Sequence, residues 1–195
     1  MIKIGLTGGI ASGKSLVSGF FEDEGIIVLD ADKIYKNLLK TNELLYNEIK
    51  NAFNLKDLDL TILANIVFNN QDKIKLLNSI AHPYVKEEYI KLLKEYERSE
   101  KLVVLDIPLL YEAKMESYCD LIICVYIDEE IQIERLIERD SFSVEDAKKR
   151  IASQMSLSEK CEISDYVIDN SKSREFSYYQ FNKILNLIKE KIDVN

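Results

Sequence analysis

The chain has 195 residues, of which 47% are hydrophobic, and it carries a formal net charge of −8. This length fits one domain with a substantial core, and the acidic balance argues against a nucleic-acid-binding surface, which needs a clustered basic face. No apolar stretch approaches the roughly 20 residues that span a bilayer and no export signal precedes the first strand-like segment, so we expect a cytoplasmic protein that does not enter a membrane.

The three cysteines, Cys119, Cys124 and Cys161, show no C-x-x-C spacing. His82 is the only histidine that could join them in a metal site. We therefore expect reduced thiols rather than a metal site or a disulfide.

The most informative motif lies near the start of the chain. Residues 8–15 read GGIASGKS and match the Walker A pattern G-x-x-x-x-G-K-[ST]. An apolar, strand-like segment at residues 2–7 precedes the motif, and a helical pattern at residues 15–24 follows it. The sequence thus predicts a phosphate loop between a buried strand and a helix; the alternative is a glycine turn that binds nothing.

Each fixed position of this motif has a chemical reason. Gly8 and Gly13 allow backbone turns that point successive N–H groups at phosphate oxygens. Lys14 would bridge the β- and γ-phosphates of ATP, and the Ser15 hydroxyl would help to coordinate Mg²⁺. We assign the following residues of this segment to ATP: Gly8, Gly9, Ala11, Ser12, Gly13, Lys14, Ser15 and Leu16.

A second strand is predicted at residues 26–30, entered through Gly25 at the end of the first helix. Residues 32–98 carry helical periodicity throughout and predict a helical insertion between strands. Pro83 is expected to begin the last helix of this insertion, because proline is tolerated in the first helical turn.

Regular alternation of strands and helices returns after the insertion. Apolar strands are predicted at residues 102–106, 120–126 and 166–169, with helices at 129–139 and 174–192. The intervening residues 140–162 look helical but poor in core residues. Near-continuous apolar strands indicate a parallel sheet with helices on both faces.

Ligands of open parallel sheets bind beyond the carboxyl ends of the strands. The sequence places Thr7, Asp30, Asp32 and Asp106 at or just after such ends. A GTPase is disfavoured, because its D-x-x-G switch needs a glycine and none follows Gly25. Small phosphotransferases remain.

Several segments, in order along nearly the whole chain, resemble the dephospho-CoA kinase family. Departures are modest: Ala11 stands where the family usually has glycine, Leu16 where threonine is common, and Leu60 where a basic residue often occurs. The segments that carry the resemblance are residues 5–15, 29–32, 66–68, 81–83, 106–112, 132–140, 150–155 and 165–170.

The resemblance implies a P-loop kinase of the nucleoside-monophosphate-kinase type: a three-layer α/β/α fold with a five-stranded parallel sheet. It implies a helical substrate domain at residues 33–98 and a small lid at 135–158, which leaves residues 1–32, 99–134 and 159–195 as the core. The activity implied is ATP- and Mg²⁺-dependent phosphorylation of the ribose 3′-hydroxyl of dephospho-CoA, the final step of coenzyme A biosynthesis. We expect a monomer or small homo-oligomer.

Asp32 is our candidate for the catalytic base, because it matches the second aspartate of the family's D-A-D motif. Its alternative role is the N-cap of the helix that follows. Asp106 ends a strand as a Walker B aspartate does, so it would hold Mg²⁺ through water, or else orient Lys14. The resemblance also places Asp106 in the substrate site.

The resemblance assigns Pro108, Leu109 and Glu112 to the dephospho-CoA site. His82 would also contact this substrate, although a structural, hydrogen-bonded histidine is an equal alternative. Gln154 and the turn at Asp169 and Asn170 are candidates for holding adenine.

Arg135 and Arg139 lie four residues apart on one predicted helix face, a spacing that can present two guanidinium groups to ATP phosphates. Adjacent Glu134 and Glu138 allow the alternative of solvated ion pairs. Our candidate catalytic residues are therefore Lys14, Asp32 and Arg139.

Two other functions remain open on the sequence. One is a different small-molecule kinase of the same fold; the other is a non-catalytic ATP-binding sensor, which would leave Asp32 and the lid arginines without a purpose.

Overall fold

A computed structural model of the protein describes residues 1–68 and 70–193. The chain forms two compact units: the sheet unit, Met1–Leu29 with Tyr96–Asn195, and the helical unit, Asp30–Glu95. The assignment of residues 33–98 to a substrate domain and of 135–158 to a lid stays a prediction.

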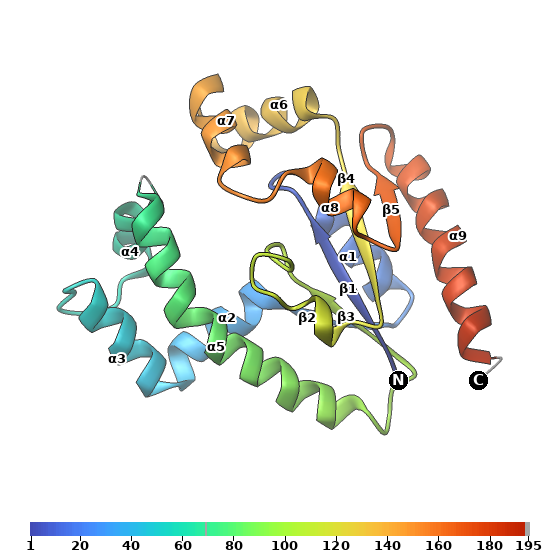
Figure 1. The fold of residues 1–195 in the computed structure, drawn as a ribbon, viewed down its shortest axis with the longest axis horizontal. Helices are drawn as coiled ribbons and strands as arrows, with labels where there is room; N and C mark the ends of the chain where they lie inside the picture. Colours follow the sequence, from blue (N-terminus) through green and yellow to red (C-terminus); the bar gives the residue numbers. More distant parts are fainter. Residues whose placement is uncertain (69, 194–195) are drawn as a thin grey trace. The chain divides into compact units, whose positions relative to one another are not determined.

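The sheet has five strands in the order β2-β3-β1-β4-β5, so the first strand lies in the centre (Figure 1). β1 pairs in parallel with both β3 and β4, and β4 pairs in parallel with β5. The predicted α/β fold with a five-stranded parallel sheet is therefore confirmed. The strands are β1 (Ile2–Gly8), β2 (Ile27–Asp30), β3 (Leu102–Asp106), β4 (Leu121–Tyr126) and β5 (Tyr166–Asp169).

Helices cover both faces of the sheet. α1 and α9 pack on one face, where apolar side chains of the strands form the main core. On the other face, α8 packs against β4, and Leu110 and Cys119 lie against Gly5 of β1. The helices of this unit are α1 (Lys14–Asp23), the short 3₁₀ helix η1 (Glu116–Tyr118), α6 (Glu129–Asp140), α7 (Val144–Ala152), α8 (Leu157–Glu162) and α9 (Arg174–Asp193).

Aromatic packing joins α1 to α9. The rings of Phe21 and Phe181 meet edge to face with centroids 4.8 Å apart, and Phe20 lies 5.5 Å from Phe181. All three side chains are almost completely buried. Such contacts add to the free energy of burying the rings, so they fix α1, and with it the preceding loop, on the sheet.

α1 ends in a left-handed glycine turn. Gly25 has φ +73°, and the N–H groups of Gly25 and Ile26 donate to the carbonyls of Glu22 and Phe21. This Schellman pattern satisfies carbonyls at the helix end and turns the chain into β2.

β5 is an edge strand, and α9 covers its last residue. The side-chain amide of Gln180 accepts a hydrogen bond from Asp169 N at 3.1 Å and donates one to Asp169 O at 2.9 Å. The backbone of Asp169 is thus satisfied by a side chain on the side away from β4.

The helical unit contains α2 (Ala31–Thr41), α3 (Glu43–Ala52), α4 (Leu60–Phe68) and most of α5 (Gln71–Tyr96). Asp30 caps α2 by accepting from Asp32 N at 2.8 Å and Lys33 N at 3.0 Å. The alternative role of Asp32 as the N-cap is therefore wrong: it lies in the first turn of the helix.

The expectation that Pro83 begins a helix is also wrong, since α5 runs without interruption from Gln71 to Tyr96 with Pro83 inside it. Proline removes one backbone hydrogen bond and crowds the preceding turn. α5 has buried residues on both sides of Pro83, including Ala81, Tyr89 and Leu93. We attribute the continuous helix to this packing, which outweighs the local cost.

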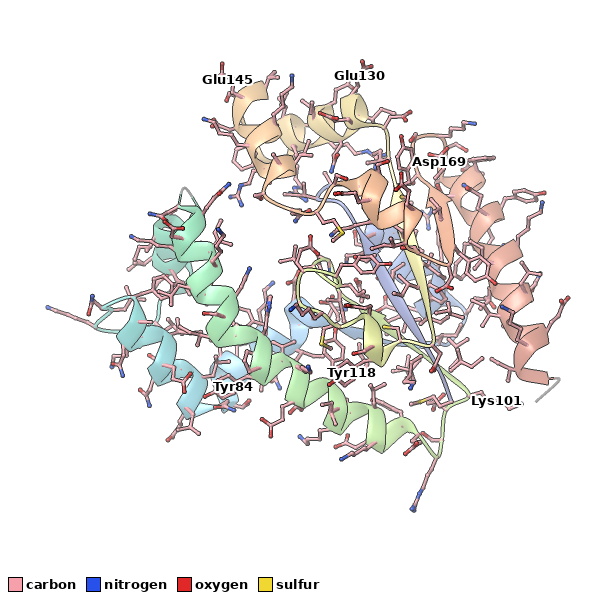
Figure 2. All side chains as sticks on the ribbon, viewed as in Figure 1. Tyr84, Lys101, Tyr118, Glu130, Glu145 and Asp169 are labelled. Carbon is pink, nitrogen blue, oxygen red and sulfur yellow. The ribbon has the colours of Figure 1, made fainter. Side chains whose placement is uncertain are left out.

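Acidic side chains are prominent on the surface of the sheet unit. Glu130 of α6 and Glu145 of α7 are exposed and point away from the ribbon (Figure 2). Within residues 1–68 and 70–193, no helix combines the length and apolar character needed to cross a membrane.

We expect Phe181→Ala to lower the free energy of unfolding by about 3–5 kcal/mol, because it leaves a cavity between α1 and α9. Leu187→Ala on the same helix is the matched control, since its side chain is 48% exposed. Urea unfolding would measure both; equal losses in the two variants would contradict the central role of this aromatic contact.

Candidate active site

The phosphate loop lies between β1 and α1 and contains two residues with left-handed backbone. Ala11 has φ 57° and Gly13 has φ 86°. A left-handed residue other than glycine costs roughly 1–2 kcal/mol. The left-handed backbone at Ala11 gives a physical reason why the family resemblance leads us to expect glycine at this position.

Three alternate carbonyls of the loop accept hydrogen bonds from side chains of distant elements. Gly8 O is 3.5 Å from Lys160 Nζ, Ile10 O accepts from Gln132 Nε2 at 2.6 Å, and Ser12 O accepts from Asn170 Nδ2 at 2.7 Å. Because these carbonyls are held by protein groups, the loop keeps one fixed backbone path.

One of these side chains is itself held by a buried partner, and a further side chain bonds to the loop. Ser177 Oγ donates to Asn170 Oδ1 at 2.9 Å, and Ser177 is fully buried on α9. Gln154 accepts from Ile10 N at 3.1 Å, so Ile10 is bonded through both its N–H and its carbonyl. Gln154 and Asn170, predicted to hold adenine, are observed here as supports of the loop.

Two loop glycines are required by close contacts. A Cβ on Gly13 would lie 2.0 Å from Asn170 Nδ2, and a Cβ on Gly8 would lie 2.6 Å from Ser12 Oγ and 2.8 Å from Val125 O. Neither position has room for a side chain without a shift of the loop or its supports.

Lys14, the first residue of α1, is held by the carboxylate of Asp106 at the end of β3. Its ammonium group pairs with Asp106 Oδ1, while Ser18 Oγ donates to Oδ2 of the same carboxylate. Asp106 is almost fully buried. The arrangement thus shows the orienting contact with Lys14 that the sequence offered as one of two roles for Asp106.

The loop offers oxygen atoms suited to a hard cation and its phosphate. Ser15 is exposed in the first turn of α1, and the side chain of Ser12 is buried with no hydrogen-bond partner for Oγ. Hydroxyl and carboxylate oxygens are ligands that Mg²⁺ accepts, so Ser15 and Asp106 fit a magnesium site. The described residues contain no cluster of three or more His, Cys, Asp or Glu placed for a metal.

The two arginines of α6 differ in their surroundings. Arg135 Nη2 donates to Asn170 O at 3.2 Å, beside the phosphate loop. Arg139 is exposed and makes two hydrogen bonds to Asp140, at 3.0 and 2.7 Å. These bonds from the guanidinium lower the pKa of the Asp140 carboxyl.

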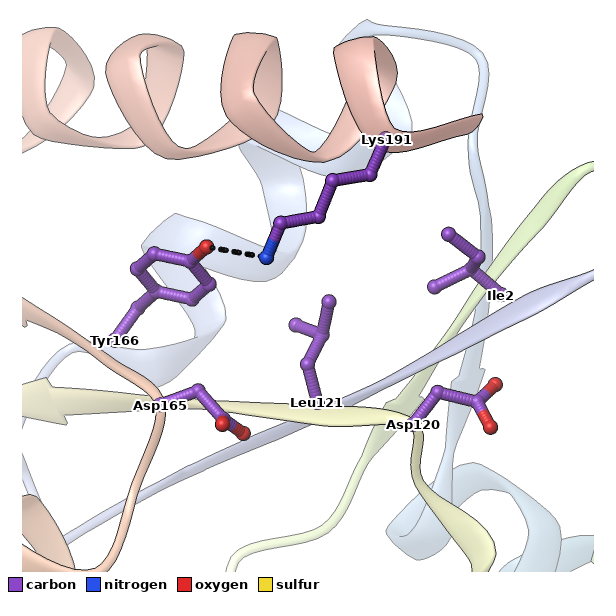
Figure 3. Close-up of a pocket in the computed structure, with 6 residues that line it drawn as sticks. All are labelled: Ile2, Asp120, Leu121, Asp165, Tyr166 and Lys191. Atoms are coloured by element: carbon purple, nitrogen blue, oxygen red, sulfur yellow. Dashed lines mark hydrogen bonds between the residues drawn. The ribbon is translucent and has the colours of Figure 1, made fainter. Parts of the chain in front are cut away.

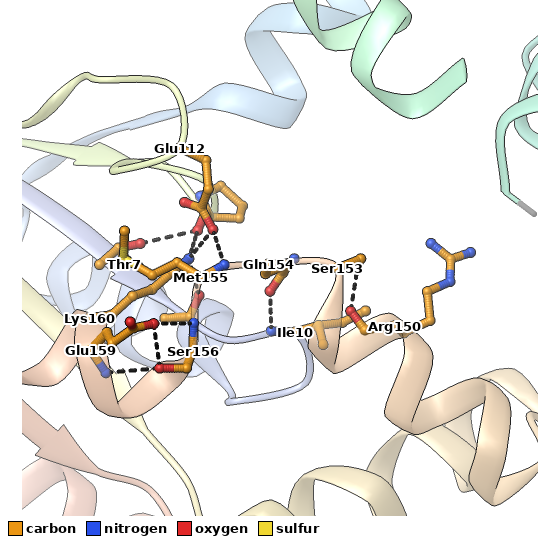
Figure 4. A network of polar contacts seen from close by, with 12 residues as sticks. Thr7, Ile10, Glu112, Arg150, Ser153, Gln154, Met155, Ser156, Glu159 and Lys160 are labelled. Atoms are coloured by element: carbon orange, nitrogen blue, oxygen red, sulfur yellow. Dashed lines mark hydrogen bonds and ion pairs between the residues drawn. The ribbon is translucent and has the colours of Figure 1, made fainter. Parts of the chain in front are cut away.

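The loop after β3 contains Pro108, Leu109 and Glu112. Pro108 O accepts from Thr7 Oγ1 at 3.1 Å and from Lys160 Nζ at 2.9 Å. Glu112 Oε1 pairs with the same ammonium group at 3.0 Å and accepts from Met155 N at 3.0 Å (Figure 4). Two of the predicted acceptor-site residues therefore share a buried lysine as partner.

Asp32 and His82 belong to the helical unit. Asp32 is exposed in the first turn of α2, directly beyond the carboxyl end of β2. His82 is half-buried in α5. The sheet unit brings together the phosphate loop, Asp106, Arg135 and Asn170; the roles of Asp32 and His82 remain predictions from the sequence.

Sequence reasoning missed Gln132, Lys160 and Ser177, which support the site from buried positions. Lys160 lies in the polar segment predicted to be helical but poor in core residues, yet its side chain has no exposed area. The S-x-x-E capping box formed by Ser156 and Glu159 marks the start of α8 in the sequence, but it gives no sign that Lys160, four residues after Ser156, is buried.

All three cysteines are free in the structure. Cys161 Sγ lies 3.5 Å from Cys124 Sγ, and its hydrogen bond to Cys124 lowers the pKa of Cys161. Burial raises the pKa of Cys119 to about 12.

A cavity of about 350 Å³ lies at the opposite end of the sheet, lined by Ile2, Asp120, Leu121, Asp165, Tyr166 and Lys191 (Figure 3). Its polar groups are used within the protein: Asp120 accepts from Lys3 N, Asp165 accepts from Ile122 N, and Lys191 reaches Tyr166. Parallel sheets bind ligands at the carboxyl ends of their strands, so we place the active site at the phosphate loop.

The comparisons with known proteins indicate the same family. A family model described as dephospho-CoA kinase matches residues 2–175. A dephospho-CoA kinase of Carboxydothermus hydrogenoformans is 44% identical over 189 residues, which cover 93% of this chain and 92% of that protein.

Solved structures agree with that match. A dephospho-CoA kinase from Campylobacter jejuni aligns with a TM-score of 0.73 and 28% identity, covering 97% of this chain and 98% of that chain. TT1252 from Thermus thermophilus aligns with a TM-score of 0.79 and 29% identity, covering 95% of this chain and 96% of that chain.

Opposite substitutions at the two left-handed positions test the loop. We expect Gly13→Ala to weaken ATP binding at least tenfold, because its Cβ would displace Asn170 and open the loop. Ala11→Gly, which relieves an unfavourable φ, should leave ATP affinity within a fewfold of native and should not lower the melting temperature. Calorimetric titration with ATP and thermal melting would check this; native-like affinity in Gly13→Ala would contradict the described loop.

Proposed function

The chain belongs to the dephospho-CoA kinase family, and we propose that the group it phosphorylates is the ribose 3′-hydroxyl of dephospho-CoA. It is a kinase that uses ATP to phosphorylate dephospho-CoA in coenzyme A biosynthesis. The observation that carries this function in the structure is the phosphate loop with Lys14 held at its end by Asp106.

For ATP, the proposed role of the loop is to hold the β- and γ-phosphates by its backbone N–H groups and by the positive end of α1. Lys14 exchanges its partner Asp106 for phosphate oxygens when the nucleotide binds. Arg139 in the same way exchanges Asp140 for a phosphate of ATP. Arg135, which lies beside Asn170, contacts the ATP phosphates as well. Charge that shifts toward the leaving phosphate during transfer is then neutralised by fixed cations.

Magnesium is the proposed metal, held by the Ser15 hydroxyl and, through water, by Asp106. When bound with ATP, Mg²⁺ neutralises phosphate charge during transfer. Ser18 supports this use of Asp106, because its hydroxyl keeps one carboxylate oxygen fixed while Lys14 moves.

For the acceptor, we propose that Asp32 takes the proton from the 3′-hydroxyl. Its support is the match to the family motif and its position beyond a strand end, while Asp30 performs the capping task. Pro108, Leu109, Glu112 and His82 are the proposed contacts to dephospho-CoA, and Asp106 borders this substrate as well.

We also propose a role for each of the two segments outside the core. Residues 33–98 act as the substrate domain, and residues 135–158, which include α7, act as a lid that closes over ATP. We further propose a cytoplasmic enzyme that works as a monomer or small homo-oligomer and has no nucleic-acid partner.

A coupled ADP-release assay with dephospho-CoA, AMP, CMP and shikimate tests the substrate. We expect turnover with dephospho-CoA alone, and phosphorus NMR of the product should place the new phosphate on the 3′-oxygen. Turnover with another acceptor would favour a different small-molecule kinase, and ATP binding without turnover on any acceptor would favour a sensor.

We expect Asp32→Asn to lower kcat by roughly 10²- to 10⁴-fold with little change in ATP affinity, because the amide cannot accept the hydroxyl proton. Asp30→Ala is the control for helix capping and should cost about 1 kcal/mol of stability. Steady-state kinetics and urea unfolding separate the two effects. Full turnover per folded molecule of Asp32→Asn would refute the base assignment.

A further inference from the structure

Lys160 is a buried lysine whose ammonium group has three protein acceptors. It belongs to α8, its side chain has no exposed area, and Nζ lies 2.9 Å from Pro108 O, 3.0 Å from Glu112 Oε1 and 3.5 Å from Gly8 O. An ammonium group has three N–H donors, so these contacts use all of them. No donor is left for a ligand.

The three acceptors come from the two loops that border the proposed reaction. Gly8 is the first residue of the phosphate loop, and Pro108 and Glu112 lie in the loop after β3. Thr7 Oγ1 donates to the same Pro108 carbonyl at 3.1 Å. Lys160 therefore contacts both the phosphate loop and the loop after β3, and its pairing with Glu112 is drawn in Figure 4.

Other contacts fix Lys160 itself. Ser164 Oγ donates to Lys160 O at 2.7 Å and contacts the hydroxyl of Tyr111 at 2.9 Å. Glu112 also accepts from Met155 N, just before the capping box of α8. The loop after β3 and α8 are thus joined at Tyr111 and at Glu112.

A contribution to the stability of the fold does not by itself explain a lysine at this buried position. Removing two charges from water costs several kcal/mol per ion, and buried ion pairs can often be replaced by apolar residues without loss of stability. A short, directional pairing does, however, fix the relative positions of the groups that it joins. Phosphoryl transfer depends on such positioning, and an error of about 1 Å can cost about 10²-fold in rate.

We propose that Lys160 is a positioning residue for phosphoryl transfer, which holds the start of the phosphate loop at a fixed distance from the loop of Pro108 and Glu112. This inference rests on the proposed function. Because protein acceptors surround the Lys160 ammonium group, its loss reduces the rate of transfer at saturation and leaves ATP affinity largely intact.

The test compares Lys160→Met with Lys189→Met. Methionine keeps the length of the side chain and removes the charge and the donors. Lys189 is the matched control, because its ammonium pairs with Glu24 at the same 3.0 Å distance but on the surface. Lys160→Gln, which keeps amide donors, serves as a second variant if Lys160→Met folds poorly.

For each variant, calorimetry would give the ATP dissociation constant, urea unfolding the folded fraction, and steady-state kinetics kcat and both KM values. We expect kcat per folded molecule of Lys160→Met to fall roughly 10- to 100-fold, with ATP affinity within threefold of native. The kcat of Lys160→Gln should lie between those of Lys160→Met and the native protein. Lys189→Met should match the native protein in both kcat and ATP affinity.

A kcat per folded molecule within twofold of native in both Lys160 variants would overturn the proposal and leave Lys160 a structural residue. A loss confined to ATP affinity would overturn it as well, since it would place Lys160 in the ATP site. Absence of dephospho-CoA phosphorylation by the native chain would instead refute the proposed function, and this inference with it.

Discussion

The phosphate loop must leave several of its N–H groups for a ligand while its carbonyls are satisfied by the protein. A loop cannot meet both demands alone, because its own backbone bonds would consume the donors. Here Lys160, Gln132 and Asn170 supply donors to the carbonyls of residues 8, 10 and 12. These donors come from α8, from α6 and from the end of β5, so the site requires the whole sheet unit to be folded.

The same contacts link the loop to the helices that follow β4. Gln132 lies before α7 and Gln154 after it, and both bond to the single residue Ile10. The segment between them is therefore anchored at both ends to one residue of the phosphate loop. The helices that follow β4 are thus fixed directly to the backbone of the phosphate loop.

The strands and the phosphate loop were predictable because their signals are local. Apolar runs of four to seven residues mark the strands, and the Walker A pattern marks a turn whose glycines admit no Cβ. The continuous α5 was not predictable at Pro83, since packing from the helical unit overrides a local rule. Nor was Lys160, because nothing in a polar helix tells which lysine faces inward; its partners Gly8, Pro108 and Glu112 are distant in sequence.

The edge of the sheet at β5 has a consequence for the behaviour of the protein at high concentration. Exposed edge strands can recruit strands of other molecules and so begin aggregation. β5 has only four residues, and Gln180 occupies both outward backbone groups of Asp169. A single side chain thus closes part of this edge to an incoming strand, so the residue that completes the fold there also protects its solubility.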